Sequence, residues 1–195
     1  RAKILRHALS GLQSNVVKEL VKEKILDWFP DRAGWNTSSI FEAMSGWQMS
    51  DDLEATLFRG LNAEEYRVKR SAGFALAKIY SGDTAIGKKL AEIANHTDDH
   101  QILAAVVETL MVGWKDHVSL KNLINRCMRS PLQLLQFIGI KRRIELKEHD
   151  KTDLEKIFKF SHQDLKFDLR RNLNSAEIVR ALIIGWPSSN EIKKR

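Results

Sequence analysis

The sequence has few of the residues that define disulfide-bonded or all-β proteins. Cys127 is the single cysteine among 195 residues, which excludes a disulfide framework and fits a reducing compartment, so we expect a cytoplasmic protein. Only 3 prolines and 10 glycines are present, too few for an all-β fold with a turn about every ten residues. The apolar stretch 103–114 is interrupted by Glu108 and falls short of the roughly 18 apolar residues of a membrane span. We therefore expect no membrane-spanning segment.

Acidic residues are scarce in one part of the chain only. The whole sequence carries 32 basic and 25 acidic residues, for a net charge of +7. Residues 1–116 carry 15 basic and 16 acidic side chains, whereas residues 117–195 carry 17 and 9, for a net charge of +8. Such asymmetry can steer an acidic partner towards the basic part, but it does not define a fold.

The apolar residues recur with the period of a helix. In the segment 68–79, the spacing of Val68, Ala72, Leu76 and Ile79 places these side chains on one stripe of a helix. Alternation at a period of two, which would indicate a strand, does not extend beyond a few residues. The breaks leave helical segments of about 10–17 residues with connections of about 2–6, as in stacked helical hairpins.

Several polar residues mark expected helix ends. Asp98 and Asp99 are placed to cap a helix that begins near His100. Thr152, followed three residues later by Glu155, matches a capping box and predicts another helix start. Gly82 is placed to end a helix in the left-handed conformation.

Two alignments of the chain with itself indicate a repeat. Residues 68–76 align with 102–110 at an offset of 34, and residues 107–114 align with 179–186 at an offset of 72. A Gly-Trp pair ends three segments, at Trp47, Trp114 and Trp186, and we expect these indoles to be packing anchors between neighbouring repeats, where hairpins stack. Two helices in each unit of about 34–36 residues are typical of an α-solenoid, in which neighbouring hairpins cover each other's apolar faces.

These segments resemble known families. Residues 68–79 resemble the second helix of a HEAT repeat, V-R-x-x-A-x-x-A-L-x-x-I, with Lys69 where arginine is usual. Residues 108–116 and 180–187 are similar to the A-L-x-x-G-W-P-D helix ends of HEAT-like arrays that follow the NACHT-type ATPase module of bacterial STAND proteins, many of them antiviral sensors.

The resemblance implies an all-α fold, a right-handed HEAT-like superhelix of about four to five helical hairpins. The array would form one continuous domain over residues 35–195, and residues 1–34 would form N-terminal helices that serve as a linker or a first repeat. Because the chain begins at Arg1, we expect it to be part of a larger protein. By the resemblance, that protein would be a STAND ATPase, and this chain would be its ligand-sensing or scaffolding region.

The sequence holds no complete catalytic or cofactor motif. Residues 82–88 match G-x-x-x-x-G-K, but Lys89 stands where a phosphate-binding loop needs Ser or Thr. His96 and His100 are separated by an expected turn at residues 97–99, and no further side chains complete a set of four ligands for a metal ion. Cys127 lies on an apolar stripe and is expected to be buried, although the neighbouring arginines would activate it if it were exposed. We therefore expect no enzyme activity, cofactor or metal in this chain.

A protein partner is the first expectation for function, and nucleic acid is the alternative. Trp28 and Trp35 flank a connection outside the clear repeats and are candidates for partner contact. The basic half could grip phosphates, or it could be a solvated face with interspersed acidic residues. The candidate anion-binding residues are Lys141, Arg142, Arg143, Lys147, Lys156, Lys159, Arg170 and Arg171. A DNA glycosylase on the same scaffold would need an acidic residue between exposed aromatic residues, and the sequence does not offer that arrangement.

Overall fold

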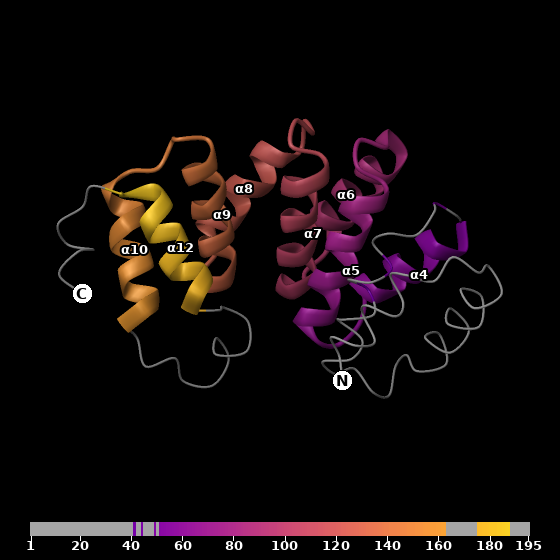
Figure 1. Ribbon diagram of the computed structural model, residues 1–195, viewed down its shortest axis with the longest axis horizontal. Helices are drawn as coiled ribbons and strands as arrows, with labels where there is room; N and C mark the ends of the chain where they lie inside the picture. The colour runs from indigo at the N-terminus through magenta and orange to yellow at the C-terminus, as the bar shows by residue number, and fades with distance from the viewer. Residues whose placement is uncertain (1–40, 42–43, 45–48, 50, 163–174, 188–195) are drawn as a thin grey trace. The chain divides into compact units, whose positions relative to one another are not determined.

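The computed structural model describes residues 41, 44, 49, 51–162 and 175–187 (Figure 1). Within these residues the elements are helices, without a strand, so the predicted all-α class is confirmed. The described helices are α4 (Asp51–Leu61), α5 (Tyr66–Ile79), α6 (Thr84–His96), α7 (His100–Gly113), α8 (Leu120–Arg129), α9 (Gln133–Glu145), α10 (Lys151–His162) and α12 (Ser175–Gly185). The expected N-terminal helices of residues 1–34 lie outside the described residues.

The chain divides into two compact units, residues 1–120 and residues 121–195. Within each unit, neighbouring helices pack in pairs, as in a helical repeat fold. One continuous array over residues 35–195 stays a prediction.

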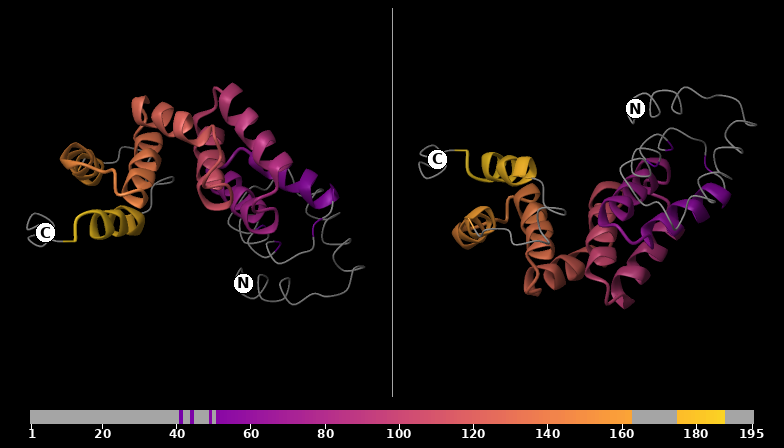
Figure 2. Two further views of the ribbon diagram at one scale, coloured as in Figure 1. Left: turned by 90° about the horizontal axis from the view of Figure 1, so that it is seen from above. Right: turned by 90° about the horizontal axis from the view of Figure 1, so that it is seen from below.

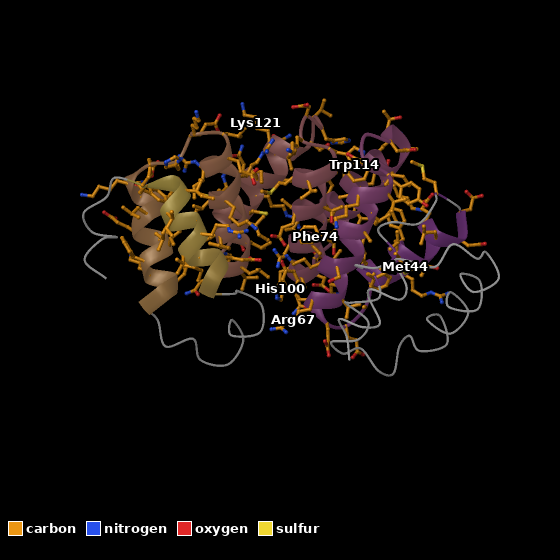
Figure 3. All side chains as sticks on the ribbon, in the orientation of Figure 1. Met44, Arg67, Phe74, His100, Trp114 and Lys121 are labelled. Atoms are coloured by element: carbon orange, nitrogen blue, oxygen red, sulfur yellow. The ribbon has the colours of Figure 1, made fainter. Side chains whose placement is uncertain are left out.

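The first unit is built around the pair α5 and α7. Helix α5 packs against both α4 and α7, and α6 packs against α7 (Figure 2). Helices α5 and α7 run parallel, with Arg67 and His100 near the same end of the pair (Figure 3). The helices come close because Gly73 lies directly on Thr109, where a larger side chain would overlap the threonine. Leucines fill the core of this unit, among them Leu57, Leu76 and Leu110.

Aspartate side chains cap two helices of the first unit. Asp83 caps α6 by accepting from the backbone N–H groups of Ala85 and Ile86. Asp99 caps α7 by accepting from the N–H groups of Gln101 and Ile102 at 2.7 and 3.2 Å, as expected from the sequence.

The turn after α5 contains a left-handed residue. Gly82 has a φ of +79°, a conformation that glycine adopts without steric cost. The left-handed conformation predicted for Gly82 is present, but α5 already ends at Ile79 with Tyr80 as its C-cap, so Gly82 belongs to the turn that follows and does not itself end the helix.

The second unit contains α9, α10 and α12, each in contact with the other two. Its buried side chains include Phe137, Ile138, Ile157, Phe160 and Leu182. Helices α9 and α12 meet at their C-terminal ends, where Gly185 lies against Ile144. This contact matches the one in the first unit between Gly113 of α7 and Ala77 of α5.

The start of α10 differs from the sequence prediction. The helix begins at Lys151, and the reciprocal capping bonds join Asp150 and Asp153 rather than Thr152 and Glu155. The N–H of Asp153 donates to Asp150 Oδ1 at 3.0 Å, and the N–H of Asp150 donates to Asp153 Oδ2 at 3.2 Å. The guanidinium of Arg143 binds both aspartates, which favours this earlier start over the predicted one.

Candidate interaction surfaces

The two described Gly-Trp ends are packing sites. Trp114 is 7% exposed, its ring lies on Gly87, and its Nε1 donates to the carbonyl oxygen of Asp83 at 2.6 Å (Figure 3). Trp186 meets the ring of His149 edge to face, with ring centroids 4.8 Å apart. Trp114 thus packs within the hairpin of α6 and α7, whereas the expected anchoring between repeats stays a prediction, and Trp47 lies outside the described residues.

The glycine of each pair is held by the turn that follows an earlier helix. The carbonyl oxygen of Gly113 accepts from the N–H of Gly82 and from Ser81 Oγ, both at 3.1 Å. The carbonyl oxygen of Gly185 accepts from His149 Nε2 at 2.7 Å. The aligned segments 107–114 and 179–186 therefore have equivalent places in their units.

A polar network crosses the interface between α5 and α7. Glu108, only 4% exposed, accepts from Arg70 Nε at 2.7 Å and from the hydroxyl of Tyr66 at 3.0 Å. Nearby, the ammonium of Lys69 lies 3.2 Å from Asp99 Oδ2. In the sequence, Glu108 is visible only as an interruption of the apolar run 103–114. An acidic residue inside such a run is the signal that it has a buried partner.

Two of the predicted anion-binding residues have partners within the chain. Arg142 is buried, and its Nη1 lies 2.9 Å from Glu145 Oε2. Arg143 binds Asp150 and Asp153, each at 3.0 Å, and donates to the carbonyl oxygen of Glu148 at 2.7 Å. The contacts of Arg143 hold the turn between α9 and α10, whereas the pair of Arg142 and Glu145 lies within α9.

The pKa values of the two aspartates in this turn, Asp150 and Asp153, are shifted in opposite directions. The hydrogen bonds from the N–H of Asp153 and from Arg143 lower the pKa of Asp150 below its usual value. Burial raises the pKa of Asp153, although the N–H of Asp150 and the charge of Arg143 act in the opposite direction. Arg143 thus compensates for the burial of a carboxylate.

The predicted lysines are more accessible than the predicted arginines. Lys147 and Lys159 are exposed, while Lys141 and Lys156 are half-buried. The ammonium of Lys141 lies 5.8 Å from the ring centroid of Phe137. Arg170 and Arg171 lie outside the described residues, as do the two candidate tryptophans, Trp28 and Trp35.

The cysteine thiol and the histidine pair, which were candidates for catalysis or metal binding, lie in the core and at helix ends. Cys127 is fully buried, and burial raises the pKa of its thiol to about 12, while the charge of Arg126 acts in the opposite direction. His96 and His100 are separated by the turn in which Asp99 caps α7. Among the described residues, no group of three or more His, Cys, Asp or Glu side chains is arranged to hold a metal ion.

Helix α12 has an apolar surface on each side. Its buried side, with Ile178, Ala181 and Leu182, belongs to the core of the second unit. Its other side exposes Val179 by 52%, Ile183 by 56% and Ile184 by 62%. We call these three residues the α12 face. Clustered large apolar side chains on a surface are typical of an interaction site.

Comparisons with family models, with curated proteins and with solved structures found no match to this chain. The similarity to HEAT repeats therefore rests on the sequence segments 68–79, 108–116 and 180–187, and it stays a prediction. In the part of the chain that the structure describes, none of the helices has the length and apolar character needed to cross a membrane.

Proposed function

We propose that this chain is a non-enzymatic protein-interaction module made of stacked helical hairpins. The observation that carries the proposal is the α12 face, where Val179 and Ile183 are one helical turn apart and more than half exposed. Leaving such side chains in water costs about 1.5 to 3 kcal/mol each relative to burial. Because Val179 is 52% and Ile183 is 56% exposed, a protein partner that covers them would recover about half of this free energy on binding.

We propose further that the module is the ligand-sensing or scaffolding region of a larger STAND-type ATPase. The support is the similarity of residues 108–116 and 180–187 to the helix ends of such arrays, together with the equivalent packing of Gly113 and Gly185. Binding of a trigger would shift the packing of the hairpins, and this shift would release or assemble the ATPase. Nucleotide hydrolysis would then take place outside this chain.

A site-specific crosslink tests the interaction module. A photoreactive amino acid is placed at Ile183 on α12, and a control is placed at Lys88, an exposed residue of α6. In cells that express the protein, we expect a discrete protein adduct from position 183 and none from position 88. If position 183 gives no protein adduct, the proposed function is wrong.

The second candidate is a phosphate-binding protein. The observation that favours it is the exposure of Lys147 and Lys159 in a part of the chain with a net charge of +8. Its salt dependence separates it from a protein partner, as set out in the Discussion.

A further inference from the structure

The α12 face corresponds to a face of α5 that another helix covers. The two sequence offsets, 34 and 72, align α5 with α7 and α7 with α12. Val179 of α12 then corresponds to Val107 of α7 and to Gly73 of α5. One turn later, Ile183 corresponds to Met111 and to Ala77.

In the first unit these positions are helix contacts. Gly73 of α5 lies on Thr109 of α7, and Ala77 lies on Gly113, so α7 runs alongside α5 in parallel. The corresponding positions of α7 are buried as well, with Val107 0% and Met111 5% exposed. On α12 alone the two positions are exposed, although their side chains are large and apolar. The repeat therefore places a helix where the described part of the chain leaves the α12 face uncovered.

The exposure of Ile184 has a different origin from that of Val179 and Ile183. It corresponds to Val112 of α7, which is itself 49% exposed. This position is thus exposed on both helices, and the helix contact of α5 is matched on α12 by Val179 and Ile183 alone.

The positive charge beside the α12 face indicates that the covering helix has acidic residues at its flanks. Between α5 and α7 an ion pair accompanies the helix contact, because Arg70 of the first helix binds Glu108 of the second, although the position of α12 that corresponds to Arg70 is Ala176 and not Arg180. Arg180 is exposed on α12, next to Val179 and one turn before Ile183 and Ile184. Because residues 117–195 carry a net charge of +8, an approaching helix with acidic flanks is attracted and one with basic flanks is repelled.

We infer that the α12 face binds an amphipathic α-helix of a partner protein, with small residues in its contact stripe and acidic residues beside it. The helix lies along α12 as α7 lies along α5, so that Val179 and Ile183 fit between its small residues and Arg180 meets an acidic side chain. The inference rests on the proposed function and specifies its partner.

The test uses two stapled helical peptides about five turns long. Both repeat Ala, Thr and Gly at every fourth residue, as residues 105, 109 and 113 do in α7. One carries Glu at the flanking positions and the other carries Lys. Binding to the full chain is measured by fluorescence anisotropy at low salt, where charge contributes most.

We expect the Glu-flanked peptide to bind at least about tenfold more tightly than the Lys-flanked peptide. The substitution Ile183→Glu should weaken binding at least about tenfold, and Arg180→Glu should remove or reverse the preference between the peptides. The control Lys88→Glu has a comparable change of charge on α6 and should leave binding unchanged. Circular dichroism verifies that each variant is folded.

Three results would overturn the inference. The first is that neither peptide binds, or that Ile183→Glu binds as the unsubstituted chain does. The second is equal binding of both peptides, which refutes the acidic partner. The third is a dimer in light scattering that Ile183→Glu dissociates, because a second copy then covers the face. In each case a crosslink from position 183 would still support the interaction module, whereas its absence would refute the module itself.

Discussion

His149 Nε2 lies 2.7 Å from the carbonyl oxygen of Gly185, and so joins the turn after α9 to the end of α12. Because the carbonyl accepts, the imidazole donates through Nε2. The same ring supports Trp186 edge to face. One side chain thus makes a hydrogen bond and an aromatic contact at the Gly-Trp end.

The first prediction concerns this side chain. His149→Ala should lower the free energy of unfolding by about 1 to 2 kcal/mol, since a hydrogen bond and an aromatic contact each contribute about 0.5 to 1.5 kcal/mol. His149→Phe keeps the aromatic contact and should recover part of the loss. Urea denaturation followed by circular dichroism measures both. Equal stability of the alanine variant and the unsubstituted chain would contradict the assigned contact.

The second prediction concerns the buried Glu108. Glu108→Ala removes the partner of Arg70, whose side chain is 24% exposed, and should cost about 2 to 3 kcal/mol. The double variant with Arg70→Met should be less destabilised than the two single effects added together, because the unpaired charge is gone. Additive effects in this double-mutant cycle would show that the two residues do not interact.

The third prediction concerns the end of α9. Lys147 has a φ of +59°, and the N–H of Glu148 after it bonds to the carbonyl of Arg143 at 2.8 Å. This is the position at which helices usually place glycine. Lys147→Gly should therefore raise the free energy of unfolding by about 0.5 to 1 kcal/mol. Lys147→Ala removes the same charge without relieving the backbone, so it should give no such gain in the same urea experiment.

The fourth prediction concerns pH and the cap of α7. Burial would raise the pKa of Asp99, but the N–H groups of Gln101 and Ile102 and the charge of Lys69 together lower it below its usual value. Asp99→Ala should cost about 1 to 2 kcal/mol at pH 7, as the loss of a helix cap does.

The sign of the pH effect follows from the lowered pKa. The ionised carboxylate stabilises the fold above the pKa of an unfolded aspartate, about 3.9, and this contribution is lost as the pH falls through the lower pKa of the folded state. The difference in stability between the unsubstituted chain and Asp99→Ala should thus shrink below about pH 4. Asp98→Ala, one residue earlier, is the matched control, with an expected change within about 0.5 kcal/mol. A difference that is constant from pH 7 to pH 3 would rule out this role of the charge.

The fifth prediction separates the two candidate functions. Labelled duplex DNA and single-stranded RNA are titrated with the chain at about 50 and 200 mM salt. A phosphate-binding protein with several contacts should lose about 10³-fold in affinity between the two conditions. The double variant Lys147→Glu and Lys159→Glu should then abolish binding. If the unsubstituted chain does not bind at about 50 mM salt, the nucleic-acid function is excluded for this chain.

Local patterns were sufficient to predict the helices. The apolar spacing of Val68, Ala72 and Leu76 predicts α5, and Asp99 predicts the start of α7, because helix periodicity and capping depend on residues within about four positions of each other. The same reasoning placed the start of α10 too late, at Thr152. The distant Arg143 favours the box formed by Asp150 and Asp153, and local spacing does not reveal it.

The sequence by itself determined the all-α class, several helix ends and the repeat offsets that relate α5, α7 and α12. Tertiary structure decided the partners of the side chains: Arg143 holds a turn, Glu108 binds Arg70 from 38 residues away, and the α12 face stays exposed. The physical reason is that a helix forms through contacts between near neighbours in the chain. Burial and ion pairing depend instead on which helix lies alongside, and an apolar stripe looks the same in the sequence whether it is covered or not.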